Sequence, residues 1–93
     1  MTQEMMYIDS KGSIYFDCRQ HAGEKDICIM ASTLCNVLLV ACRELGIAPK
    51  EEADGHMAFD IVDAPAELIA TFRWVQKVFE EIASQFPDYL TVY

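Results

Sequence analysis

The chain has 93 residues, a hydrophobic fraction of 53% and a formal net charge of −8. This length allows one small domain with a single core, residues 1–93, and the composition is that of a globular protein without low-complexity segments. The negative charge argues against a nucleic-acid groove, which needs clustered Lys and Arg, and favours a basic partner or simple solubility.

The first residues lack the basic stretch and apolar run of a signal peptide. The longest apolar run lies inside residues 27–42 and is interrupted by Ser32, Thr33 and Asn36, so it is expected to be too short to span a membrane. We therefore expect a cytoplasmic protein that does not associate with membranes.

Four cysteines are present, and Cys28, Cys35 and Cys42 recur every seven residues on one predicted helix. Seven residues span about 10 Å of helix, which is beyond the reach of a disulfide. No CxxC pair is present, so neither a metal site nor a cofactor is expected, and the thiols are predicted to be reduced.

Two alternating segments open the chain, Met5–Asp9 and Ser13–Arg19, with the turn sequence Asp9-Ser10-Lys11-Gly12 between them. This pattern predicts a β-hairpin. One face of the second strand would be apolar and would carry Ile14, Phe16 and Cys18. The other would face solvent and would carry Tyr15, Asp17 and Arg19.

The segment from Ile27 to Leu45 predicts a long helix, with Asp26 as its N-cap and Gly46 as its C-terminal stop. Its polar residues form only a narrow stripe. A sheet, a second helix or a second subunit must therefore cover most of its sides, and we expect a homodimer.

After this helix, His56–Val62 alternates, and the turn Asp54-Gly55 would let Lys50–Ala53 pair with it. His56 itself has no evident partner and is interpreted as structural. A second helix is predicted after Asp63, a good cap, and its apolar residues repeat at spacings of four and three. Trp74 lies off this stripe, so it either flanks the core, which we favour, or contacts a second subunit.

A short extended segment, Tyr89–Tyr93, ends the chain. Together these elements predict an α+β fold of two layers, a small antiparallel β-sheet with two helices packed on one face. The predicted order is strand, strand, helix, strand, strand, helix and a short terminal strand.

The polar loop before the first helix has the residue types of a thiol active site. Cys28 would lie in the first turn of the helix, where free N–H groups and the positive dipole end favour a thiolate, and His21 lies nearby along the loop. We therefore predict Cys28 as a nucleophile and His21 as its general base. A buried, inert cysteine and an exposed loop histidine without a role are the alternatives.

Two further residues are predicted to support this site. Ser32 follows Cys28 by one helical turn, and it either bonds back to a main-chain carbonyl or orients the site. Asp26 caps the helix and is also a candidate to reach His21.

The hairpin, the His21-Ala22 loop, the Cys-x3-Ser element of Cys28 and Ser32, and the Phe86-Pro87 exit of the last helix together resemble the Prp family of ribosomal-processing cysteine proteases. That family shows a Gly-His-Ala element followed by an Asp-Ile-Val-Cys-Ala-Ala-Val-Ser-like segment. The resemblance covers nearly the whole chain, and the His-Ala and Cys-x3-Ser elements are its specific parts.

The resemblance implies a cytoplasmic, usually dimeric endopeptidase with Cys28 as nucleophile and His21 as general base. Its substrate would be the N-terminal extension of a large-subunit ribosomal protein precursor, or a structural protein in a phage-borne relative. The chain departs from the family pattern in having Gln20 in place of glycine and a shorter loop from histidine to cysteine. The alternative is therefore a catalytically degenerate acidic dimer that binds a basic ribosomal or phage peptide without cleaving it.

Overall fold

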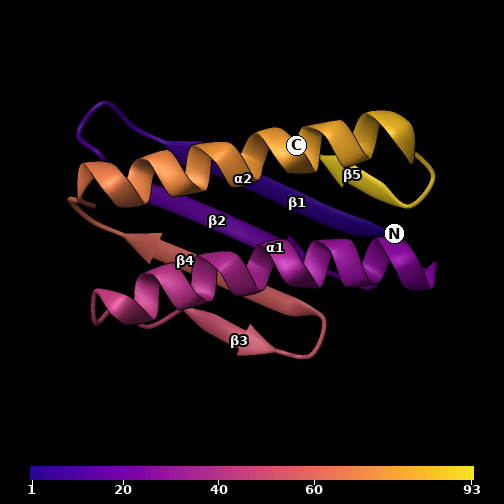
Figure 1. Cartoon of the computed structure of the whole chain (residues 1–93), viewed down its shortest axis with the longest axis horizontal. Helices are drawn as coiled ribbons and strands as arrows, with labels where there is room; N and C mark the ends of the chain where they lie inside the picture. The colour runs from indigo at the N-terminus through magenta and orange to yellow at the C-terminus, as the bar shows by residue number, and fades with distance from the viewer.

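The computed structural model describes residues 1–93, in which two long helices lie side by side on one face of a five-stranded sheet (Figure 1). The predicted α+β architecture of two layers is confirmed. In chain order the elements are β1 (Thr2–Ile8), β2 (Ile14–Arg19), α1 (Lys25–Glu44), β3 (Glu51–Ala53), β4 (His56–Ile61), α2 (Ala66–Gln85) and β5 (Leu90–Val92).

The strands lie in the order β3-β4-β2-β1-β5. Both predicted hairpins are confirmed, since β1 pairs antiparallel with β2 and β3 pairs antiparallel with β4. The last strand differs from the expectation of an antiparallel sheet, because β5 pairs parallel with β1. The reason is that α2 carries the chain back along the sheet, so β5 enters at the end where β1 begins, with Thr2 opposite Leu90.

The start of α1 differs from the prediction by two residues. Glu24 is the N-cap, and its carboxylate accepts a hydrogen bond from the Ile27 N–H at 3.0 Å. The prediction of Asp26 as the cap is therefore wrong, and Asp26 instead lies exposed in the first turn. At the other end, Gly46 has a φ of +72°, as expected for the glycine that stops a helix.

The start of α2 also differs from its prediction. Pro65 occupies the N-cap position and no side chain caps the helix, so Asp63 is not the cap. Trp74 is 68% exposed, so it does not flank the core as favoured from the sequence.

Phe16 of β2 is at the centre of the core between the helices and the sheet. Its ring centroid lies 6.1 to 6.3 Å from those of Phe59, Phe72 and Phe79, and all four rings are fully buried. These aromatic pairs join β2 and β4 to α2 in one packed unit.

By length and composition alone, α1 would be able to cross a membrane, which differs from the expectation of a run that is too short. In the structure it is a core helix that packs on the sheet. Six of its side chains are buried there: Ile27, Ala31, Cys35, Leu38, Leu39 and Cys42.

Asp17, predicted to face solvent, is buried on the sheet face opposite the helices. The Arg19 guanidinium donates to both of its carboxylate oxygens at 2.8 and 2.7 Å, and Nε2 of His56 lies 3.2 Å from Oδ2. These hydrogen bonds, that of Arg19 above all, lower the pKa of Asp17. His56 therefore has a partner that the sequence did not reveal.

Glu4 is a fully buried carboxyl group on the helix-facing side of β1. The amide of Gln76 on α2, with its NH₂ group turned toward β1, donates to both carboxylate oxygens. Burial raises the pKa of Glu4 to about 8, and the nearby Glu80 carboxylate adds to the shift. Near pH 7 this side chain is therefore mostly a neutral acid.

This carboxyl group predicts that stability falls as the pH rises. Between the ordinary pKa of 4.5 and the folded value of about 8, the folded chain holds a proton that the unfolded chain has lost. Each pH unit in that interval then costs at most about 1.4 kcal/mol of unfolding free energy. Thermal unfolding measured from pH 5 to 9 should show a falling Tm, and Glu4→Gln should flatten this dependence.

The matched control is Glu67→Gln, because Glu67 is exposed in the first turn of α2. This variant should keep the wild-type slope. An unchanged slope in Glu4→Gln would show that Glu4 is not the group responsible.

Candidate active site

The loop between β2 and α1 begins with an unusual backbone conformation. Gln20 has a φ of +70°, a left-handed value that glycine adopts far more easily than other residues. Two hydrogen bonds hold it there: its N–H donates to the carbonyl of Gly55 at 2.8 Å, and its own carbonyl accepts from the Thr2 hydroxyl at 3.0 Å. The chain therefore makes a glycine-like turn just before His21.

After this turn, the backbone of the loop lies within hydrogen-bonding distance of the Cys28 thiol. The Ala22 N–H donates a hydrogen bond to Sγ of Cys28 at 3.1 Å. Cys28 is the fourth residue of α1, and its own N–H bonds to the Glu24 carbonyl at 3.0 Å. A backbone N–H donor and the positive end of a helix both stabilise negative charge on this sulfur.

A pocket of about 450 Å³ opens beside Cys28, between α1 and the β3–β4 hairpin. Its lining includes two histidines and two carboxylates but no lysine or arginine. The residues that line it are Thr2, Cys18, Gln20, His21, Cys28, Ala31, Ser32, Cys35, Asn36, Glu52, Ala53, Asp54, Gly55, His56 and Met57.

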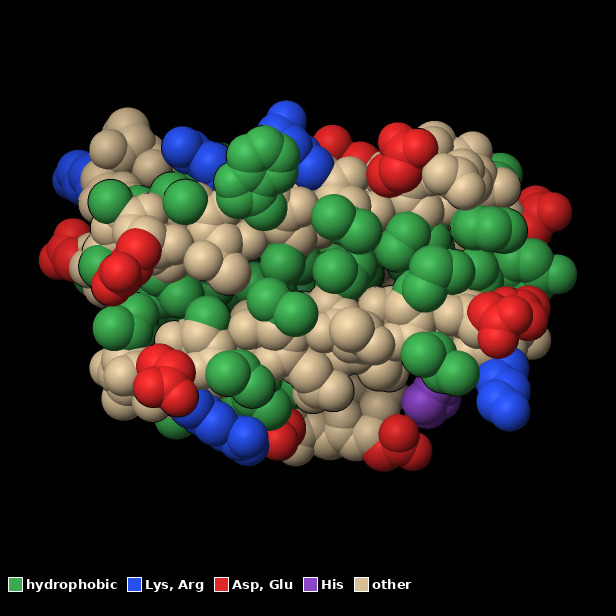
Figure 2. All heavy atoms as spheres, in the orientation of Figure 1, with side chains coloured by type: hydrophobic (Ala, Val, Ile, Leu, Met, Phe, Trp, Pro, Cys, Tyr) green, Lys and Arg blue, Asp and Glu red, His purple; other side chains and the backbone are tan.

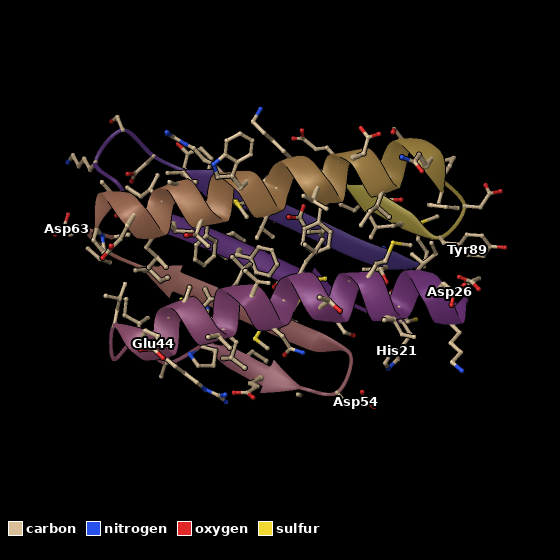
Figure 3. All side chains as sticks on the ribbon, viewed as in Figure 1. His21, Asp26, Glu44, Asp54, Asp63 and Tyr89 are labelled. Carbon is tan, nitrogen blue, oxygen red and sulfur yellow. The ribbon has the colours of Figure 1, made fainter.

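Three of the four predicted site residues, His21, Cys28 and Ser32, therefore lie on one pocket, whereas Asp26 does not. In Figure 3, Asp26 lies at the end of α1 and His21 points toward the β3–β4 turn. Ser32 is exposed and its hydroxyl makes no bond to a main-chain carbonyl; that bond is made by its neighbour Thr33, to Ile29 at 2.8 Å.

His21 has one charged partner, and it is not the one considered from the sequence. Its Nε2 lies 3.6 Å from a carboxylate oxygen of Asp54, in the turn between β3 and β4 (Figure 3). The sequence identified Asp54-Gly55 as a turn, but a turn signal says nothing about which loop it meets across the sheet.

The other three thiols have environments unlike that of Cys28. Cys18, Cys35 and Cys42 are buried, whereas Cys28 is partly exposed. The nearby Cys35 thiol and burial raise the pKa of Cys18, and burial raises that of Cys42 to about 11. No group of three or more His, Cys, Asp or Glu side chains is placed to hold a metal ion.

Comparison with known proteins gives a match in fold alone. No protein-family model matches the sequence, and no curated protein matches it. The structure is similar to that of an essential ribosomal processing protease, Prp from S. aureus, solved in complex with a covalently linked product peptide. The TM-score is 0.80 at 16% identity, over 99% of this chain and 97% of that one.

A second similar structure is SMU.848 from Streptococcus mutans. Its TM-score is 0.75 at 20% identity, over 99% of this chain and 91% of that one. The chain therefore has the fold of a ribosomal processing protease along its whole length, and the resemblance predicted from the sequence is confirmed at the level of the fold.

The site geometry predicts which thiol reacts first. Cys28 should be alkylated by iodoacetamide about tenfold or more faster than Cys18, Cys35 or Cys42, because only its sulfur is both partly exposed and bonded to a backbone N–H. Peptide mapping by mass spectrometry after short exposures would measure the four rates. Equal labelling of all four thiols under native conditions would contradict the prediction.

Proposed function

We propose that this protein is a cysteine endopeptidase of the Prp type that removes an N-terminal extension from a basic precursor. The substrate class is a large-subunit ribosomal protein precursor, or a structural protein where the gene is borne by a phage. The observation that carries the proposal is the Ala22 N–H bonded to the Cys28 sulfur, in a pocket that also contains His21 and in a fold shared with a ribosomal processing protease.

In this reaction Cys28 gives its thiol proton to His21, and the sulfur adds to the carbonyl carbon of the peptide bond. The tetrahedral intermediate collapses when His21 returns the proton to the leaving amine, which breaks the C–N bond and leaves a thioester. Water, deprotonated by His21, then cleaves the thioester and restores the thiol. Ser32, whose hydroxyl has no main-chain partner, is proposed to orient the substrate.

The charge of the pocket supports a basic substrate. Glu52 and Asp54 line it without any lysine or arginine, and the chain carries a net charge of −8. Positive charge on a precursor would raise its rate of encounter with this negatively charged protein, and salt would screen the attraction. We further propose that the protein acts in the cytoplasm, where such precursors are made, without binding nucleic acid or membranes.

The proposed chemistry predicts cleavage that depends on two side chains. Incubation with precursors from the same genome that carry N-terminal extensions should release the extension, as seen by mass spectrometry. Cys28→Ala and His21→Ala should each lower the rate by at least about 100-fold, the usual scale for losing a nucleophile or general base. Cleavage by the wild type should slow as salt rises.

The matched control is Cys42→Ala, because Cys42 is buried in the core and does not line the pocket. It should be less stable but should cleave. Binding of the peptides without any cleavage by the wild type would contradict the proposal and support the catalytically degenerate alternative.

We also propose that the protein is a homodimer, joined through the apolar strip between the two helices. Figure 2 shows hydrophobic side chains gathered along the groove between α1 and α2. Val37, Trp74 and Val78 are 44%, 68% and 44% exposed. In a monomer, these apolar side chains would stay in contact with water, which is unfavourable. The interhelical strip comprises Met30, Leu34, Val37 and Ala41 of α1 with Val78 of α2, and Trp74 is exposed on α2 one turn before Val78.

A self-complementary apolar strip predicts a dimer at micromolar concentration, measured by light scattering after size exclusion. Val78→Asp should shift the mass to that of a monomer, because it introduces a charge into the interface. Val62→Asp is the control, since Val62 is 73% exposed and outside the strip. A monomeric wild type would contradict this proposal without affecting that of the active site.

A further inference from the structure

The turn between β3 and β4 meets the loop that carries His21. The carbonyl of Gly55 accepts the Gln20 N–H at 2.8 Å, so the residue before the histidine is fixed to this turn by a backbone hydrogen bond. The imidazole of His21 lies against Gly55 itself. A methyl group placed there would lie 3.1 Å from Nε2, which is tighter than an ordinary contact, and 3.5 Å from Cδ2.

Asp54 adds a charged contact to the same ring. A carboxylate oxygen lies 3.6 Å from Nε2, and Figure 3 shows the two side chains converging from the loop and the turn. This separation suits an ion pair and is slightly too long for a hydrogen bond. Catalytic hydrogen bonds are often longer before substrate binds and shorten in the complex.

We propose that the Asp54-Gly55 turn is the third component of the active site, and that it positions His21. The Asp54 carboxylate accepts a hydrogen bond from the Nε2–H group, which leaves Nδ1 as the basic nitrogen that exchanges a proton with Cys28. Gly55 has no side chain, so the Nε2 side of the ring can approach the turn closely. This inference rests on the proposed role of His21 as general base.

The alternatives from the sequence fit this role less well. Asp26 makes no ion pair with His21 and lies outside the pocket. Ser32 is on α1 with Cys28, so it moves with the nucleophile and not with the base. The β3–β4 turn contacts both the backbone just before His21 and the His21 ring itself.

The first experiment determines the tautomer of His21 in the absence of substrate. The ¹⁵N chemical shifts of the neutral His21 ring report which of its nitrogens holds the proton. The wild type should hold it on Nε2. Asp54→Ala should lose this preference, whereas Asp54→Asn, which keeps an acceptor oxygen and suits the turn, should retain it.

The second experiment measures cleavage by the same variants. Asp54→Ala should lower kcat about two- to fivefold with KM unchanged, the modest effect expected of one exposed contact. Asp54→Asn keeps the acceptor oxygen but not the charge, so it should restore part of the rate. Asp60→Ala is the control, because Asp60 is an exposed aspartate on β4 that does not line the pocket.

Substitutions at two glycines test whether the position of the His21 ring depends on the absence of a side chain at Gly55. Gly55 and Gly46 have φ values of +78° and +72°, so alanine strains the backbone similarly at both. A methyl group at Gly46 meets nothing within 4 Å, whereas one at Gly55 meets the His21 ring. Both variants should lose similar stability, but only Gly55→Ala should change the His21 ring shifts and lower kcat.

The two proposals can fail separately. Cleavage that needs Cys28 and His21, with ring shifts and kcat unchanged in Asp54→Ala and Gly55→Ala, would overturn only the role of the turn. If no precursor is cleaved, the ring shifts still decide whether the turn fixes the proton of His21. A wild-type ring that holds its proton on Nδ1 would overturn the inference.

Discussion

The left-handed backbone at Gln20 is the constraint on which the rest of the site depends. A residue with a side chain pays about 1 kcal/mol or more for this conformation, and two hydrogen bonds offset the cost. One partner, Thr2, is at the start of β1, and the other, Gly55, is in the β3–β4 turn. The loop therefore takes its shape only when the strands on both sides of β2 are in place, and formation of the site is coupled to assembly of the sheet.

The same helix shows how environment separates thiols of one type. The seven-residue spacing puts Cys28, Cys35 and Cys42 along one stripe of α1, yet only Cys28 is near the N-terminal end of the helix, where the loop supplies a backbone N–H. Cys42 lies in the core, where the absence of solvent disfavours the thiolate. Cysteines equally spaced in the sequence therefore need not be equally reactive, because the burial of the thiol and the hydrogen-bond donors beside it change along the stripe.

Local patterns predicted most of the fold. Strand alternation, the two turn sequences and the apolar stripe of α2 are properties of short segments, and all appear in the structure. The N-cap was misassigned because Asp26 and Glu24 both have a carboxylate able to cap, and the backbone geometry alone selects Glu24. The parallel pairing of β5 depends on where α2 ends relative to β1, which no local pattern contains.

The site was predictable in part for the same reason. His21, Cys28 and Ser32 are close in sequence, so a helix start and its preceding loop were enough to bring them onto one pocket. His56, which contacts Asp17, and Asp54, which contacts His21, come from the β3–β4 hairpin, far along the chain, and only the register of the sheet brings these pairs together. Glu4 was missed because nothing in an alternating strand distinguishes a buried carboxyl group from an exposed one.

The departures from the Prp pattern leave a loop with a glycine-like turn that still reaches Cys28. Gln20 replaces a glycine but keeps a glycine-like φ, and the short loop still brings the Ala22 N–H onto the sulfur of Cys28. What distinguishes the site is the exposure of its histidine, whose side chain is 63% exposed and whose partner carboxylate is 97% exposed. Such a pair is weak in water and is strengthened when water is displaced. If the proposed mechanism holds, a bound peptide that covers the pocket would strengthen the contact between Asp54 and His21 during the step in which His21 takes a proton.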